Sequence, residues 1–91
     1  MYYVYVLRSW TQNKFYIGYT ADLDRRIKEH KLGECHTTHR LDNPELIFYE
    51  VFRNEKDAKR REEYFKTTKG KKTLKLMLQE TLAPVNRLRS V

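Results

Sequence analysis

The sequence is poor in the residues that cross-link or interrupt a fold. Its 91 residues include one cysteine, two prolines and three glycines. A single cysteine excludes an intramolecular disulfide, which is typical of proteins in a reducing compartment. With 40% hydrophobic and 13% aromatic residues, the composition is that of a folded chain and not a disordered one. This length predicts one domain, which we assign to residues 1–83, followed by a short basic tail at residues 84–91.

Long apolar runs are also absent. No stretch approaches the ~18 apolar residues that a membrane span requires. The first residues lack the basic segment and apolar run of a secretory signal. These absences predict a cytoplasmic protein that does not associate with a membrane.

Acidic residues are outnumbered by basic ones. The chain has 19 Lys and Arg against 12 Asp and Glu, a net charge of +7. This excess favours a polyanionic partner, although ribosome-associated and membrane-surface proteins share it. Residues 56–75 hold nine basic and three acidic side chains, and therefore six of the seven net charges. This segment is either a solvated helix face or a contact surface for nucleic-acid phosphates.

Three segments rich in β-branched and aromatic residues predict strands. Residues 2–8 and 15–19 are joined by a polar turn and form an antiparallel hairpin, which sets Tyr5 and Tyr16 in neighbouring strands. Residues 46–52 form a third strand. Its apolar run indicates burial on both faces, so we expect this strand to be central.

Three helices complete the predicted order. The first begins after Thr20 or Asp22, either of which can cap it, and stops before Gly33. The second covers residues 55–67 and is capped by Asn54.

A break at Gly70 separates the second helix from a third at residues 73–82, which Pro84 ends. The resulting order, β-β-α-β-α-α, predicts an α+β fold with a small three-stranded, mainly antiparallel sheet flanked by helices.

Residues 15–30 are the most informative stretch, because an aromatic strand ends there and runs directly into a basic helix. Arg26 and His30 lie four residues apart and therefore share one helix face. Gly18 lets the chain turn closely into the helix, where a side chain would obstruct a ligand. An anion such as a phosphate is the expected ligand.

Glu62 is a carboxylate on an apolar helix stripe. Ala58 and Phe65 mark the core-facing side of the second helix, and Glu62 stands four residues after Ala58 on that side. It either pairs with a nearby Arg or Tyr, or ligates a divalent cation such as Mg²⁺, which needs few protein ligands. Its neighbour Glu63 has Lys59 and Lys66 at ion-pair spacing on the surface.

A zinc site is not expected at Cys35, His36 and His39. A structural zinc ion needs four suitably spaced ligands, and no second pair is present.

The spacing of several dispersed motifs resembles the GIY-YIG endonuclease domain, in particular its small stand-alone bacterial members. The likeness covers roughly residues 2–82. Its motifs are Tyr3-Val4-Tyr5, Tyr16-Ile17-Gly18, Arg26 with His30, and the helix positions Ala58, Glu62 and Lys66. Tyr3 replaces the glycine of the first triplet, and the asparagine often found near the active site is not assigned to Asn86.

This resemblance implies an endonuclease that hydrolyses phosphodiester bonds in nucleic acid, with DNA favoured over RNA, and that uses Mg²⁺ or Mn²⁺. It implies a metal ligand at Glu62, a phosphate-stabilising fork at Arg26, and a water positioned by two tyrosines. The implied catalytic residues are Tyr5, Tyr16, Arg26, His30 and Glu62, and the implied substrate-binding residues are Gly18, Arg25, Lys59, Lys66 and Lys69.

Structural roles compete with these assignments. The tyrosines can serve sheet packing, Arg26 can pair with Asp22, and His30 can cap its helix or lie on the surface. A nucleic-acid-binding module of the same fold without turnover is the alternative function.

Overall fold

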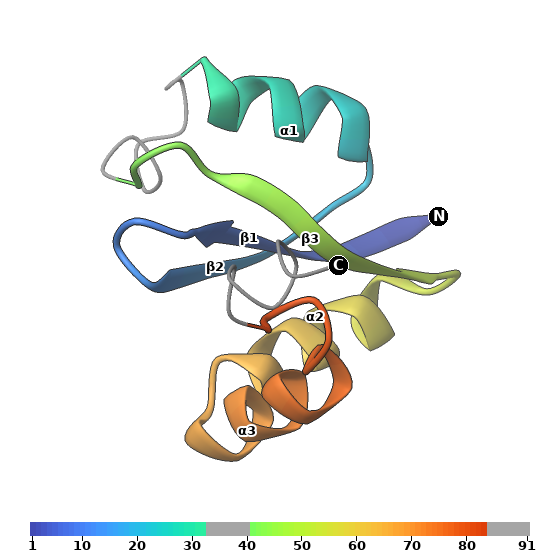
Figure 1. The fold of residues 1–91 in the computed structure, drawn as a ribbon. Coiled ribbons are helices and arrows are strands. Elements are labelled where there is room, and N and C mark those ends of the chain that lie inside the picture. Colours follow the sequence, from blue (N-terminus) through green and yellow to red (C-terminus); the bar gives the residue numbers. More distant parts are fainter. Residues whose placement is uncertain (33–40, 84–91) are drawn as a thin grey trace.

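The structure, a computed structural model, describes residues 1–32 and 41–83 (Figure 1). It has the predicted order β-β-α-β-α-α, which confirms the α+β class. The elements are β1 (Tyr2–Ser9), β2 (Lys14–Thr20), α1 (Leu23–Lys31), β3 (Glu45–Phe52), α2 (Glu55–Phe65) and α3 (Thr68–Met77). None of the described helices is long and apolar enough to cross a membrane.

The sheet is antiparallel, with the strand order β2-β1-β3. The expectation that β3 is central is therefore wrong, because β1 holds that place. Residues 4–7 of β1 are all buried, whereas Tyr49 and Val51 of β3 are about half exposed. β3 is an edge strand that covers the core with only part of its length. An apolar run in the sequence therefore does not distinguish a central strand from an edge strand.

Helices cover both faces of the sheet. Figure 1 shows α1 over one face and the pair α2 and α3 over the other. Because strand side chains alternate between faces, the run in β1 supplies both layers. The core lies on the α2 and α3 side, where buried residues pack together: Val4, Val6, Ile17, Ala58, Phe65, Leu74 and Leu78.

The first helix is capped by Asp22. Its side chain accepts a hydrogen bond from the backbone N–H of Arg25 at 3.1 Å, and Thr20 Oγ1 accepts one from the Asp22 N–H at 3.1 Å. This capping settles the predicted choice between Thr20 and Asp22. Gly33, Cys35, His36, His39, Pro84 and Asn86 lie outside the described residues.

The third helix starts and ends five residues earlier than predicted. Thr67 caps it by accepting a hydrogen bond from the N–H of Gly70 at 3.0 Å, so Gly70 lies inside α3 and does not break the chain. A Cβ at this position would lie 1.8 Å from the carbonyl oxygen of Tyr64. The absence of a side chain at Gly70 therefore allows α3 to approach the end of α2 closely.

We expect Gly70→Ala to lower the free energy of unfolding by about 1–3 kcal/mol, because the added methyl group overlaps the α2 backbone. In an unobstructed helix the same change would stabilise by about 0.5–1 kcal/mol. Urea denaturation shows whether the substitution lowers or raises the free energy of unfolding. The exposed Lys72→Ala in the same helix is the control, and a stabilised Gly70→Ala protein would contradict the close approach.

Candidate active site

Tyr5 occupies the centre of the sheet. It is fully buried, and its partner across the β1–β2 ladder is Gly18. A Cβ on Gly18 would lie 2.5 Å from the Tyr5 hydroxyl oxygen and 2.7 Å from its Cζ. Gly18 therefore provides space for the tyrosine ring. The predicted role of Gly18 in the turn into the helix is not needed, because Thr20 and Asp22 form that turn.

Tyr5, Tyr16 and His30 form a compact cluster, as predicted for the two tyrosines. The ring centroids of Tyr5 and Tyr16 are 6.2 Å apart, and His30 lies 5.6 Å from Tyr5 and 5.1 Å from Tyr16. The Tyr5 hydroxyl and His30 Nε2 are 2.8 Å apart and share a hydrogen bond. His30 is 3% exposed, which excludes the surface role suggested for it.

Burial also governs the charge of His30. Its pKa lies below the ordinary value of 6.5, chiefly because burial disfavours the charged ring. The positive charge of Arg26 lowers the pKa further, and the carboxylate of Glu29 partly opposes this. At neutral pH the imidazole is therefore neutral, and with its proton on Nδ1 it can accept the Tyr5 proton at Nε2.

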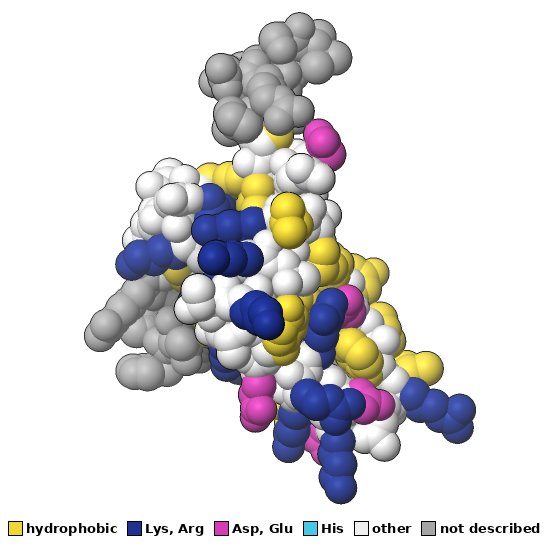
Figure 2. Space-filling view, turned by 90° about the horizontal axis from the view of Figure 1, so that it is seen from below, with side chains coloured by type: hydrophobic (Ala, Val, Ile, Leu, Met, Phe, Trp, Pro, Cys, Tyr) yellow, Lys and Arg dark blue, Asp and Glu magenta, His cyan; other side chains and the backbone are white. Residues whose placement is uncertain are grey.

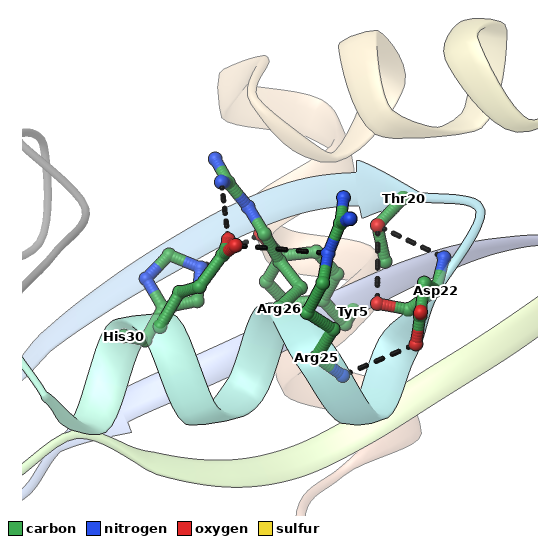
Figure 3. A network of polar contacts seen from close by, with 7 residues as sticks. Tyr5, Thr20, Asp22, Arg25, Arg26 and His30 are labelled. Atoms are coloured by element: carbon green, nitrogen blue, oxygen red, sulfur yellow. Dashed lines mark hydrogen bonds and ion pairs between the residues drawn. The ribbon is translucent and has the colours of Figure 1, made fainter.

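Glu29 ties the two arginines of α1 together (Figure 3). Its carboxylate lies 3.0 Å from Arg26 Nη1 and 3.6 Å from Arg25 Nε. The Arg25 side chain is 72% exposed, whereas that of Arg26 is 38% exposed. The suggested pairing of Arg26 with Asp22 is not formed, because the Asp22 carboxylate caps the helix. The sequence prediction missed Glu29, although its spacing of three and four residues from the arginines is typical of ion pairs on a helix.

Glu62 belongs to α2, the helix that covers the face of the sheet opposite α1. Its side chain is 17% exposed and pairs with Lys66 at 3.3 Å. The predicted pairing of Glu63 with Lys59 and Lys66 is wrong, because Lys59 pairs with Glu55. In both observed pairs the acid precedes the lysine by four residues, which is the favourable orientation on a helix.

The substrate-binding residues predicted on α2 and α3 are lysines, and they belong to a basic face. Lys59 lies on the side of α2 near β2, with its Nζ 5.5 Å from the centre of the Tyr19 ring. Lys66 caps the end of α2, and Lys69 is in the first turn of α3. Figure 2 shows Lys and Arg side chains gathered over this face. The predicted residues thus come from two groups of elements: Tyr5, Tyr16, Gly18, Arg25, Arg26 and His30 from β1, β2 and α1, and Glu62, Lys59, Lys66 and Lys69 from α2 with its C-cap and α3.

The donor set for a metal ion is sparse. Within residues 1–32 and 41–83, no group of three or more His, Cys, Asp or Glu side chains could hold a metal ion. Glu62 offers one hard carboxylate. This donor fits Mg²⁺, which keeps most of its water ligands, better than Ca²⁺ or zinc.

Comparison with known proteins identifies the family. The profile of the GIY-YIG catalytic domain matches residues 1–75. The chain belongs to the GIY-YIG family. This confirms the resemblance, and it places the chain in a family of nuclease domains.

Small relatives match most of the length of this GIY-YIG chain. A UPF0213 protein of Clostridium perfringens is 32% identical, covering 94% of this chain and 92% of the relative. One from Natronomonas pharaonis is 38% identical over 87% of this chain and 93% of its own. The solution NMR structure of a UPF0213 protein from Bacillus halodurans is 32% identical, with a TM-score of 0.54 over 85% of both chains.

We expect Gly18→Ala to lower the free energy of unfolding by about 1–3 kcal/mol, because Tyr5 is enclosed and cannot move aside freely. Urea denaturation of Gly18→Ala, Tyr5→Leu and the double variant measures the coupling between the two positions. Leucine lacks the atoms that the new methyl group would meet. The cost of Gly18→Ala should therefore shrink in the Tyr5→Leu background, and an unchanged cost would contradict the assigned contact.

Acidification should destabilise the fold through His30. Its folded pKa is below its unfolded pKa, so the folded state binds fewer protons between the two values. The contribution of His30 is complete above pH 6.5 and is lost as the pH falls through the folded pKa. Urea denaturation at pH 7.5 and pH 5.5 should show a larger loss for the wild type than for His30→Gln. Equal losses would contradict the prediction.

Proposed function

We propose that this protein is a metal-dependent endonuclease that hydrolyses phosphodiester bonds in nucleic acid, with DNA as the preferred substrate. The observation that carries the proposal is the hydrogen bond between the Tyr5 hydroxyl and a buried His30, next to Arg26. A packing tyrosine needs no titratable partner. The pairing of a phenol with a neutral imidazole supports proton transfer instead.

Tyr5 needs this partner in order to act as a base. A phenol with a pKa of ~10 is about one part in a thousand ionised at pH 7. In the proposed step, a water molecule attacks phosphorus and gives its proton to the Tyr5 oxygen, while the Tyr5 proton passes to His30 Nε2. The bond from phosphorus to the leaving oxygen breaks, and that oxygen takes a proton from solvent. Because Tyr5 is fully buried in the free protein, the side chains around it must move when substrate binds.

Arg26 would stabilise the charge that develops on the phosphate. Its guanidinium can donate two parallel hydrogen bonds to phosphate oxygens. In the free protein the Glu29 carboxylate holds this guanidinium at 3.0 Å. A substrate phosphate therefore competes with Glu29, which makes Glu29 a positioning residue and not a catalytic one.

Glu62 would hold the divalent ion, Mg²⁺ or Mn²⁺, with one carboxylate. When bound, such an ion supplies charge that polarises the scissile phosphate. Lys66, which pairs with Glu62, and Lys59 next to Tyr19 would contact the flanking phosphates. Arg25 and Lys69 would extend this electrostatic contact.

The second candidate is a nucleic-acid-binding module of the same fold without turnover. The observation that favours it is the ion pair between Glu62 and Lys66 on the helix layer opposite α1. A carboxylate neutralised by a lysine is less available to a metal ion. The basic face of α2 and α3 suits both candidates.

The deciding experiment incubates the purified protein with single-stranded, duplex and branched DNA and RNA, in Mg²⁺, in Mn²⁺ and in chelator. We expect Arg26→Ala to reduce cleavage about 10²–10³-fold, because it removes a donor to the developing charge. Glu62→Gln and Tyr5→Phe should also abolish most cleavage. Glu63→Gln makes the same charge change on the neighbouring residue and should leave cleavage intact. If the wild type binds nucleic acid but shows no cleavage that these variants lack, the protein is the binding module instead.

A further inference from the structure

A cleft of about 340 Å³ lies at the far end of the β1–β2 hairpin, against α3. Its walls carry three positive charges from two elements, Arg8 of β1 and Lys71 and Lys75 of α3. The other lining residues are uncharged, namely Asn13, Phe15 and Leu82. We call this the Arg8 cleft. It is separate from the Tyr5 cluster, because Arg8 and Phe15 are ladder partners on the α3 side of the sheet.

The two lysines of the Arg8 cleft are not neutralised. They stand one helical turn apart on α3, so their like charges repel each other. Four basic side chains of α2 and its C-cap each pair with a carboxylate, namely Lys59, Arg60, Arg61 and Lys66. Neither Lys71 nor Lys75 has an ion pair with a described residue. An anion in the cleft would relieve their repulsion.

Arg8 is held in place as a rigid wall of the cleft. Its guanidinium lies over the Phe15 ring, 4.6 Å from the centroid, and 5.3 Å from the centre of Trp10. Its Nη2 donates to Asn13 Oδ1. Its Nε is shielded from solvent and has no hydrogen-bond partner within the described residues, and the lost solvation lowers the Arg8 pKa. Arg8 forms no ion pair with any carboxylate in residues 1–32 and 41–83, so its desolvated charge favours an anionic ligand.

We propose that the Arg8 cleft binds a backbone phosphate of the nucleic acid, as a second phosphate site away from Arg26. The proposal rests on the proposed function for the identity of the ligand. Lys59 lies next to Tyr19 at one end of β2, and the cleft includes Phe15 at the other. These positions are four residues, or about 13 Å, apart along the strand. About four nucleotides of one strand span that distance at the spacing of B-form DNA. The cleft would therefore hold a phosphate about four nucleotides from the one at Lys59.

The first test measures binding of a fluorescent 20-nucleotide DNA in chelator, over a range of salt concentrations. Lys71→Gln with Lys75→Gln should weaken binding roughly tenfold at low salt and reduce the slope of log affinity against log salt by about 0.7–0.9. Lys72→Gln is the control for each single cleft substitution, because it removes one charge from the same helix outside the cleft. Equal effects of the control and the cleft variants would overturn the proposal.

The second test observes the Arg8 Nε–H signal by NMR. This signal should shift on addition of the DNA and remain in place with an oligonucleotide whose backbone is made neutral by methylphosphonate groups. Inorganic phosphate at matched concentration distinguishes a free anion from a nucleic acid. A signal that responds to inorganic phosphate but not to DNA would overturn the nucleic-acid assignment, as would a signal that responds to neither.

The two proposals can fail separately. Cleft-dependent binding without metal-dependent cleavage would sustain the Arg8 cleft and refute the nuclease. If cleavage requires Arg26 while the variant with Lys71→Gln and Lys75→Gln binds DNA as tightly as the wild type, the nuclease proposal holds and the phosphate site in the cleft is refuted. Both lysines are exposed, so these variants should fold, and circular dichroism checks this directly.

Discussion

The hydrogen bond between Tyr5 and His30 depends on a glycine across the sheet. Without a side chain at Gly18, the Tyr5 ring can cover the neighbouring strand and reach His30 on α1. That contact joins the central strand to the helix above it, and it brings Tyr16 and Arg26 into the same region. The glycine in the strand, the orientation of α1 and the neutral state of His30 are thus parts of one arrangement.

The sheet separates two kinds of chemistry. The α1 side carries a phenol, an imidazole and an arginine, which are groups suited to proton transfer and charge stabilisation. The other side carries Glu62 and a basic surface from α2 and α3 (Figure 2). Strand β2 is the edge next to both. In the proposed complex the nucleic acid runs along this edge, with Lys59 near one end and the Arg8 cleft near the other.

The predicted order of elements was confirmed because strong local signals marked each one. Aromatic and β-branched residues defined β1 and β2, and Asp22 and Asn54 capped their helices as expected. The errors arose where two structures share one local signal. An apolar run suited either a central or an edge strand, so β3 was misplaced. A glycine suited either a break or a close contact, so α3 was shifted.

The sequence by itself indicated the family through its dispersed motifs, and it determined the order of the elements and the proximity of Tyr5 and Tyr16, because local residue patterns define two strands and a short turn pairs them. Only the tertiary structure decided the charge and partners of those residues. The low pKa of His30 comes from burial, the hydrogen bond between Tyr5 and His30 joins a strand to a helix 25 positions away, and the Arg8 cleft joins residues more than 60 positions apart. Solvent exclusion and contacts across the sheet are long-range effects, which no local pattern encodes.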